Sequence, residues 1–132
     1  METKITLYEL GRLNEDEARE MLERLRWPYG AVCQHCGYTV AYKLKPRNEF
    51  STHVRKGVYK CKECKKQFSV TVGTIFEGSH IKIKKWLMAI YLMCSSKKGI
   101  SAFQLHRMLG ITIKSALFMA HRIRYAMSQS PF

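Results

Sequence analysis

The chain has 132 residues, and its 23 Lys and Arg residues outnumber its 10 Asp and Glu residues, which gives a formal net charge of +13. This length fits one or two small units and is too short for most complete enzymes that also carry a recognition domain. Hydrophobic residues make up 46% of the sequence, which excludes a wholly disordered basic tail.

Nothing in the sequence resembles a membrane span or a secretory leader. The longest uninterrupted apolar run covers residues 86–94, about half of the roughly 20 residues that a membrane span requires. The first 25 residues are acidic and amphipathic rather than basic and then apolar. We therefore expect a soluble, cytoplasmic protein associated with the nucleoid, with no membrane partner.

The positive charge is unevenly distributed along the chain. The first 30 residues contain five basic and seven acidic residues, whereas the remaining 102 contain 18 basic and three acidic ones. A basic segment of this density attracts a polyanion, most often nucleic acid, because each neutralised phosphate releases condensed counterions. A merely solubilising surface and a contact with structured RNA stay open as alternatives.

An amphipathic helix of about a dozen residues is predicted to begin after Asn14. Asn14 can act as N-cap with Glu17 three residues later, and Pro28 prevents much continuation. The apolar stripe of this helix consists of Ala18, Met21, Leu22 and Leu25. We expect this helix to hold the following segment in place.

Residues 31–72 are typical of short strands and turns. Strands are predicted over residues 38–44, 57–60 and 67–72, with a polar, basic loop over residues 45–56. Such a segment is too small for an independent apolar core and needs a covalent or metal cross-link.

Four cysteines provide this cross-link as two CxxC pairs, Cys33–Cys36 and Cys61–Cys64, separated by 24 residues. Each pair can close a tight turn that points two sulfurs at one place, and two such turns form a tetrahedral thiolate cage for one structural Zn²⁺. The alternatives are disulfides, which are disfavoured inside cells, and a redox CxxC, which needs a single pair at the start of a helix.

Other residues near the cysteines have weaker claims to a role. Cys94 is predicted to pack on the apolar face of a helix rather than to bind metal. His35 and His53 could replace a cysteine ligand only if one of the four were unsuitable. The second CxxC pair is flanked by Lys60, Lys62, Lys65 and Lys66, which would offset the thiolate charge and could contact phosphate.

Three helices are predicted after residue 79. The first has apolar residues with helical spacing and ends at Lys97, Lys98 and Gly99; its apolar residues are Ile83, Trp86, Leu87, Ile90, Tyr91 and Cys94. A second helix should begin after Ser101 and end at Gly110, which suits a left-handed turn. The third should extend from residue 112 or 113 to residue 127.

The last two helices have the apolar spacing of a helix-turn-helix. Leu105 and Leu109 precede the turn glycine, and Ile111, Ala116 and Met119 follow it. The small residue expected five positions before the glycine is missing, because Leu105 is there and His106 follows it. We therefore expect a looser crossing of the two helices.

On a helical wheel the last helix has one apolar and one cationic, aromatic side. The apolar side contains Ala116, Met119, Ala120, Ile123 and Met127. The outer side suits the major groove of DNA, where cationic side chains reach guanine edges or phosphates. Its rings, Phe118 and Tyr125, could instead pack on another domain or subunit. The full set of expected DNA contacts is Lys60, Lys62, Lys65, Lys66, Lys97, Lys98, Lys114, Ser115, Phe118, His121, Arg122 and Tyr125.

Several strings of the sequence, in combination, resemble a known family. They are LRWP at 25–28, CQHCG at 33–37, YKCKECKKQFSVTVGTIF at 59–76, KWLMAIY at 85–91, SSKKGIS at 95–101 and HRIR at 121–124. Over residues 14–127 the chain resembles the amino-terminal region of bacterial insertion-sequence transposases of the zinc-ribbon group related to Merlin elements. The resemblance implies a zinc ribbon and helix-turn-helix that bind terminal inverted repeats, followed by an acidic-triad catalytic domain of the ribonuclease H type.

No such catalytic triad is visible in this chain. The acids after residue 30 are Glu49, Glu63 and Glu77, and they do not form a set that could hold two metal ions for phosphoryl transfer. We therefore expect a non-enzymatic protein with no small-molecule substrate. A homodimer and a separate catalytic domain are the two alternatives for a protein partner, and continuation of the native protein into a catalytic domain stays open as well.

The overall expectation is a small α+β protein with two domains. Residues 1–78 would form the N-terminal helix and the four-cysteine zinc ribbon, and residues 79–132 the three-helix helix-turn-helix unit. The expected function is sequence-specific binding of double-stranded DNA. The alternatives are a zinc-ribbon adaptor that binds protein and a module that binds RNA.

Overall fold

The structure, a computed structural model, describes residues 5–45 and 57–129. Most of the predicted loop over residues 45–56 lies outside the described residues. The described elements are α1 (Leu7–Arg12), α2 (Glu15–Arg26), β1 (Ala41–Lys43), β2 (Tyr59–Cys61), β3 (Gln67–Phe68), α3 (Ile83–Ser95), α4 (Ala102–Leu109) and α5 (Ile113–Ser128). In the described part of the chain, no helix is long and apolar enough to cross a membrane.

The chain divides into two compact units. One combines residues 1–18 with residues 79–132, and the other comprises residues 19–78. The structure thus groups the N-terminal residues with the C-terminal helices, whereas the sequence predicts domains at 1–78 and 79–132. Compact units are not by themselves independently folding domains, so the division into domains stays a prediction.

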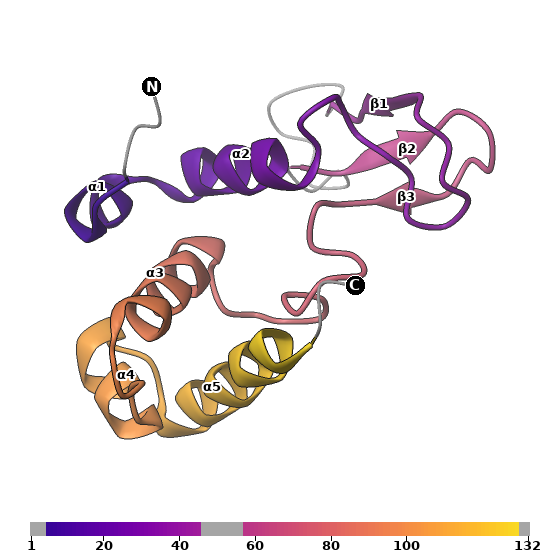
Figure 1. The fold of residues 1–132 in the computed structure, drawn as a ribbon. Coiled ribbons are helices and arrows are strands. Elements are labelled where there is room, and N and C mark those ends of the chain that lie inside the picture. Colours follow the sequence, from indigo (N-terminus) through magenta and orange to yellow (C-terminus); the bar gives the residue numbers. More distant parts are fainter. Residues whose placement is uncertain (1–4, 46–56, 130–132) are drawn as a thin grey trace. The chain divides into compact units, whose positions relative to one another are not determined.

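The unit of residues 19–78 contains a small antiparallel sheet in the order β1-β2-β3 (Figure 1). Tyr42 pairs with Lys60, and Lys60 pairs with Gln67 on its other side. The strands are shorter than the sequence predicts. In particular, the strand predicted over 67–72 ends at Phe68, because successive tight turns begin at Ser69, Thr71 and Thr74.

An aromatic cluster forms the centre of this unit. The Trp27 ring meets Tyr59 edge-on at 5.5 Å between centroids and Phe68 at 5.7 Å. Among the described residues of the unit, the buried hydrophobic side chains are Leu22, Trp27, Cys33, Cys61, Phe68, Val70 and Phe76. Leu25, predicted in the apolar stripe of α2, is instead 69% exposed, so that prediction was wrong. Trp27, directly after the helix, takes its place in the core.

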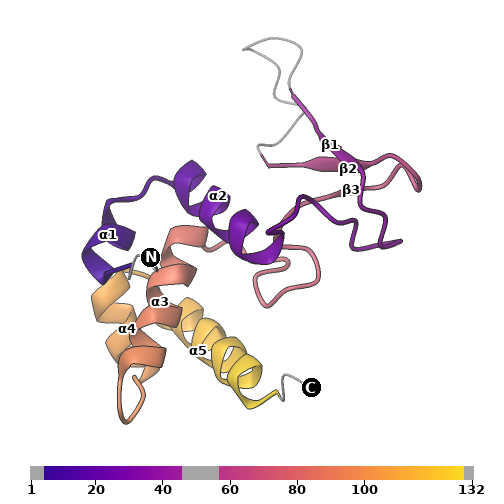
Figure 2. The same ribbon diagram turned by 45° about the horizontal axis from the view of Figure 1, so that its top comes forward.

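Helices α3, α4 and α5 pack together in the other unit (Figure 2). Ser101 caps α4 by accepting a hydrogen bond from the Gln104 N–H, and Thr112 caps α5 in the same way. Gly110 between them has φ 66°, the left-handed conformation that its position predicts. The three predicted helices and the short turn between the last two are confirmed.

The core of the helical unit differs from the sequence prediction at two places. Helix α3 buries Ile83, Trp86, Ala89 and Met93, so its inward stripe is rotated from the predicted one. Cys94, predicted to be packed, is exposed. Met127, predicted on the inner side of α5, is 57% exposed because the helix extends a full turn beyond Ile123, its last buried residue.

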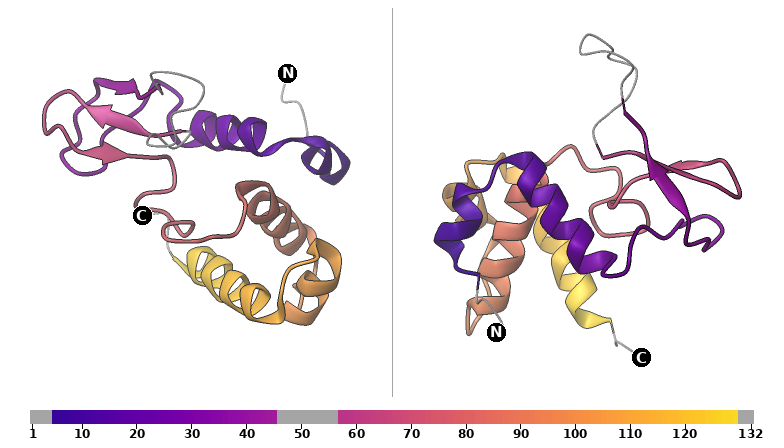
Figure 3. Two further views of the ribbon diagram at one scale, coloured as in Figure 1. Left: turned by 180° about the vertical axis from the view of Figure 1, so that it is seen from behind. Right: turned by 90° about the horizontal axis from the view of Figure 1, so that it is seen from above.

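The sequence prediction missed helix α1. Thr6 and Glu9 form a reciprocal capping box: the Glu9 N–H donates to Thr6 Oγ1, and the Thr6 N–H donates to Glu9 Oε2. Leu10 is buried where α1 packs against α3 (Figure 3). Six residues are too few to show helical periodicity, so the capping box was the available signal.

Candidate metal centre and nucleic-acid interface

The four cysteines come together as the two CxxC pairs predict. The Sγ atoms of Cys33, Cys36, Cys61 and Cys64 all lie within 4.8 Å of one another. Cys33 Sγ is 3.6 Å from Cys64 Sγ, and Cys36 Sγ is 3.5 Å from Cys61 Sγ. A tetrahedron with Zn–S bonds of about 2.3 Å has sulfurs roughly 3.8 Å apart, so these residues fit one structural Zn²⁺.

The two cysteine turns have matching backbones. The Cys33 N–H donates to the Tyr38 carbonyl and the Cys61 N–H to the Lys66 carbonyl, five residues later in each case. The residue after the second cysteine is left-handed in both turns, with φ 77° at Gly37 and φ 62° at Lys65. The left-handed residue reverses the chain direction, so that the backbone returns to accept the hydrogen bond from the first cysteine. Two different sequences therefore form turns of the same shape and place their two sulfurs in the same way.

This geometry makes Gly37 a test of the first turn. A Cβ at Gly37 would meet nothing within 4 Å, so Gly37→Ala acts through the backbone alone. We expect Gly37→Ala to destabilise the zinc-loaded protein by about 1 kcal/mol, since an L-residue pays a steric cost in the left-handed region. Gly37→Asn, which tolerates that region, should lose less. Equal losses in a urea denaturation series would show that the turn does not depend on this conformation.

Desolvation and hydrogen bonds shift the pKa values of two thiols in the cluster, those of Cys36 and Cys61. Desolvation raises the pKa of Cys61. Hydrogen bonds from the backbone N–H groups of Cys64 and Glu63 and from neighbouring thiols outweigh desolvation and lower this pKa to about 7. For Cys36, a backbone hydrogen bond at Tyr38 lowers the pKa, whereas desolvation and hydrogen bonds with the other three cysteines raise it to about 12. The thiols must become thiolates to bind a metal, so Zn²⁺ binding releases protons.

Arg26, at the end of α2, links this helix to the metal site. Its guanidinium donates to the Val70 carbonyl and, at 2.7 Å, to the side-chain oxygen of Gln34, which lies between Cys33 and Cys36. The guanidinium also lies over the Trp27 ring, 5.4 Å from its centroid. Desolvation lowers the pKa of Arg26, against the raising influence of Glu77. The sequence assigns no role to Arg26, because its partners lie in other segments of the chain.

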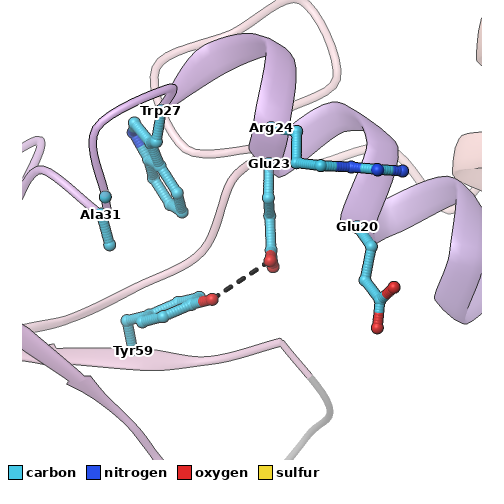
Figure 4. A pocket seen from close by; sticks show the side chains of 7 residues that line it. Glu20, Glu23, Arg24, Trp27, Ala31 and Tyr59 are labelled. Atoms are coloured by element: carbon cyan, nitrogen blue, oxygen red, sulfur yellow. Dashed lines mark hydrogen bonds between the residues drawn. The ribbon is translucent and has the colours of Figure 1, made fainter.

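Helix α2 also contacts strand β2 through a polar pair beside a small pocket (Figure 4). The Tyr59 hydroxyl donates to Glu23 Oε2 at 3.1 Å. Desolvation, followed by the charge of Glu23, raises the pKa of Tyr59 to about 12. The pocket has a volume of about 370 Å³ and is lined by Glu20, Glu23, Arg24, Trp27, Gly30, Ala31 and Tyr59. The contact supports the expectation that this helix holds the ribbon in place.

The expected phosphate contacts of the ribbon lie around the second cysteine turn. Lys62, Lys65 and Lys66 are exposed, and Lys60 is half-buried in β2. His35 is exposed in the first turn and does not belong to the sulfur cluster, whereas His53 lies outside the described residues. The cysteines are therefore the group that fits the metal.

Helix α5 buries one side, while polar side chains and some apolar ones, such as Leu117, are exposed. Ala116, Met119, Ala120 and Ile123 are buried, whereas Lys114, His121 and Tyr125 are exposed. Ser115 is half-buried and belongs to the cap, since its hydroxyl accepts from Thr112 Oγ1. Lys114, His121 and Tyr125 are thus exposed polar residues of the same helix.

Phe118 and Arg122 are less free than the sequence suggests. The Phe118 ring meets Trp86 edge-on at 6.2 Å between centroids, and the Arg122 guanidinium lies 4.6 Å from the Phe118 ring centroid. The ring therefore packs within its own unit, a position that the helical wheel could not reveal because Trp86 comes from another helix. Phe118 remains partly exposed.

Two side-chain contacts that the sequence analysis did not assign involve α4 and α5: one spans the turn between them, and the other reaches the segment before α4. His106 Nδ1 bonds to the Ile111 carbonyl across the turn. Arg124, on α5, donates to the Ile100 carbonyl at 3.0 Å, just before α4. His106, which the sequence presented as a departure from the usual pattern, thus joins the end of α4 to the start of α5. The exposed Lys97 and Lys98 precede α4, next to Gly99.

Glu15 stabilises the start of α3 from a distant part of the sequence. Its carboxylate accepts from the Ile83 N–H at 2.8 Å and the Lys84 N–H at 3.4 Å, where no acid of α3 itself is available. We expect Glu15→Gln to lower the free energy of unfolding by about 1 kcal/mol. Glu17→Gln, which removes the same charge from a residue that bonds only locally with Asn14, should cost less. Equal losses in thermal unfolding would show that the distant cap contributes nothing.

Comparison with known proteins extends this description. Residues 13–67 match the transposase zinc-ribbon domain of the IS1595 family. Over 79 residues the chain is 29% identical to an uncharacterized protein in the transposable element ISH50 of Halobacterium salinarum. This match covers 60% of the chain but only 25% of the relative, so the chain spans a small part of that protein. No solved structure gives a significant match. The grouping with Merlin elements stays a prediction. The chain is related to the transposases of insertion sequences through its zinc-ribbon region.

Proposed function

We propose that this chain is a sequence-specific module for double-stranded DNA that recognises the terminal repeats of an insertion sequence and does not itself cut or join DNA. The zinc ribbon and the helical unit each supply part of the contact. In this division the lysines of the ribbon contact phosphates and set the register, while helix α5 contacts base edges.

The observation that carries the proposal is the exposed side of α5 after a tight, capped turn. Lys114 and His121 are exposed on this helix, while Ala116, Met119, Ala120 and Ile123 are buried. Its sequence and the rest of residues 78–132 contain no acidic residue. A helix that presents cations without acids can enter the major groove at little electrostatic cost.

The match to a transposase zinc-ribbon domain supports DNA as the polyanion. The match therefore favours DNA over the two alternatives, an RNA contact and a protein adaptor, which the positive charge alone leaves open. The proposal of a non-catalytic role rests on the positions of the three acidic residues that follow residue 30. Glu63 lies within the second cysteine turn and Glu77 accepts a hydrogen bond from the Gly73 N–H, while Glu49 lies outside the described residues.

Selection from a pool of random duplexes, followed by measurement of dissociation constants, tests the proposal. The zinc-loaded protein should enrich one sequence and bind it at least about 1000-fold more tightly than a scrambled duplex. An RNA duplex of the enriched sequence should bind no better than the scrambled DNA. Failure to enrich any sequence, or tighter binding of RNA, would contradict the proposal.

Two lysine variants separate the proposed roles with the same loss of charge. Lys114→Ala, on α5, should lower the ratio of specific to scrambled affinity by about 10-fold, because it removes a base contact. Lys65→Ala, on the ribbon, should weaken both duplexes alike because it removes only a phosphate contact. Parallel losses from both variants would remove this division of labour.

A further inference from the structure

The sheet of the zinc ribbon has two chemically different faces. The pairing of Tyr42 with Lys60 and of Lys60 with Gln67 is extended by one step, because the Lys62 N–H donates to the Val40 carbonyl at 3.1 Å. Alternate residues of a strand point to opposite faces. One face, which we call the outer ribbon face, is therefore made by Val40, Tyr42, Lys60, Lys62 and Gln67.

The opposite face is already occupied within the unit. Tyr59 and Phe68 stack with 5.9 Å between ring centroids, and both meet the Trp27 ring. Cys61 of the same face belongs to the sulfur cluster. The aromatic rings of this face thus pack within the unit. They do not cover the side chains of the outer ribbon face, which lies on the other side of the sheet.

The outer ribbon face exposes one aromatic ring and one aliphatic side chain. Tyr42 is 47% exposed, and Val40 is also exposed. Tyr38, two residues before Val40, is a further exposed ring next to this face. Contiguous exposed apolar side chains make such a face a candidate surface for contact with a ligand.

The charge on this face narrows the class of ligand. Lys60 lies directly across the sheet from Tyr42, and Lys62 lies across from Val40. None of the five positions that define the outer ribbon face carries an acid. An exposed ring with cations on the neighbouring strand suits a polyanion that carries flat rings of its own, which describes nucleic acid.

Because paired bases hide their flat sides in the stack, a tyrosine on an open sheet can stack only on a base that is unpaired. We infer that the outer ribbon face binds single-stranded DNA, with Tyr42 stacked on a base and Lys60 and Lys62 at the adjacent phosphates. This site is distinct from the proposed duplex contact of α5. It uses the same ribbon lysines for a second kind of ligand.

Fluorescence anisotropy with a labelled oligothymidylate of about 12 nucleotides tests the inference on the zinc-loaded chain. Tyr42→Ala should weaken binding about 10-fold, whereas Tyr42→Phe, which keeps the ring, should bind as the parent protein does. An abasic oligonucleotide of equal length keeps the phosphates but offers no base to stack on. The parent protein should therefore bind it no better than Tyr42→Ala does.

Tyr29→Ala is the matched control, since Tyr29 is fully exposed (101%) in the loop after α2 and lies outside the outer ribbon face. It should leave oligothymidylate binding unchanged. Unchanged binding by Tyr42→Ala, an equal loss on a duplex, or tighter binding of single-stranded RNA would each overturn the inference. If the parent protein binds the single strand in a Tyr42-dependent way but no duplex, the proposed duplex function fails and this inference stands.

Discussion

Removal of zinc is expected to unfold residues 19–78. Among its described residues this unit has few buried hydrophobic side chains, and two of them are the metal-ligating Cys33 and Cys61. A core this small does not offset the conformational entropy of its chain, so metal binding supplies folding free energy. In a two-dimensional NMR spectrum, a zinc chelator should collapse the amide signals of residues 19–78 to the narrow range of an unfolded chain.

Single cysteine variants separate the metal effect from a general effect of thiol loss. Cys64→Ser should reduce the zinc content to well below one ion per chain and unfold the same residues, because a hydroxyl is a poor ligand beside three thiolates. Cys94→Ser is the matched control, since Cys94 is exposed on α3 and lies outside the sulfur cluster. A folded Cys64→Ser protein with stoichiometric zinc would contradict the assignment of the four ligands.

Replacement of Trp86 by alanine should destabilise the helical unit by about 3–5 kcal/mol. Trp86 is 0% exposed, meets Phe118 edge-on and donates a hydrogen bond from Nε1 to Ser79 Oγ at 3.1 Å. Its removal leaves a cavity that the small neighbour Ala89 on the same helix cannot fill. Urea denaturation followed by circular dichroism at 222 nm measures the loss.

Two comparisons sharpen this prediction. Trp86→Phe keeps most of the ring volume and should cost less than Trp86→Ala, mainly through the lost bond to Ser79. The zinc content of Trp86→Ala should remain one ion per chain, because the sulfur ligands belong to the other unit. A small loss of stability from Trp86→Ala would show that the three helices are not held together by this side chain.

The metal site and the helix ends could be predicted from the sequence because they depend on local spacing. Two residues between cysteines suffice to define each turn, and the caps at Ser101 and Thr112 depend on residues three positions later. Gly110 likewise indicates the end of α4, because glycine adopts the left-handed conformation of a helix C-cap without steric cost. Such signals stay within one turn of the chain, so they survive without knowledge of the tertiary fold.

The contacts between distant segments could not be predicted. Glu15 caps a helix that begins 68 residues later, and Arg26 reaches Val70, 44 residues away. Phe118 resembled a solvent-facing residue on the wheel because the wheel omits Trp86. The exposed Cys94 shows the same limit, since the inward side of α3 depends on where the neighbouring helices lie.

The salt dependence of duplex binding tests most directly whether this basic scaffold binds DNA through its phosphates. Association constants of the zinc-loaded chain for one duplex, measured between about 50 and 200 mM NaCl, give the slope of the logarithm of the association constant against the logarithm of the salt concentration. Neutralisation of about six phosphates predicts a slope of about −5. A slope near zero would show that the excess of positive charge plays no part in binding and would contradict the account.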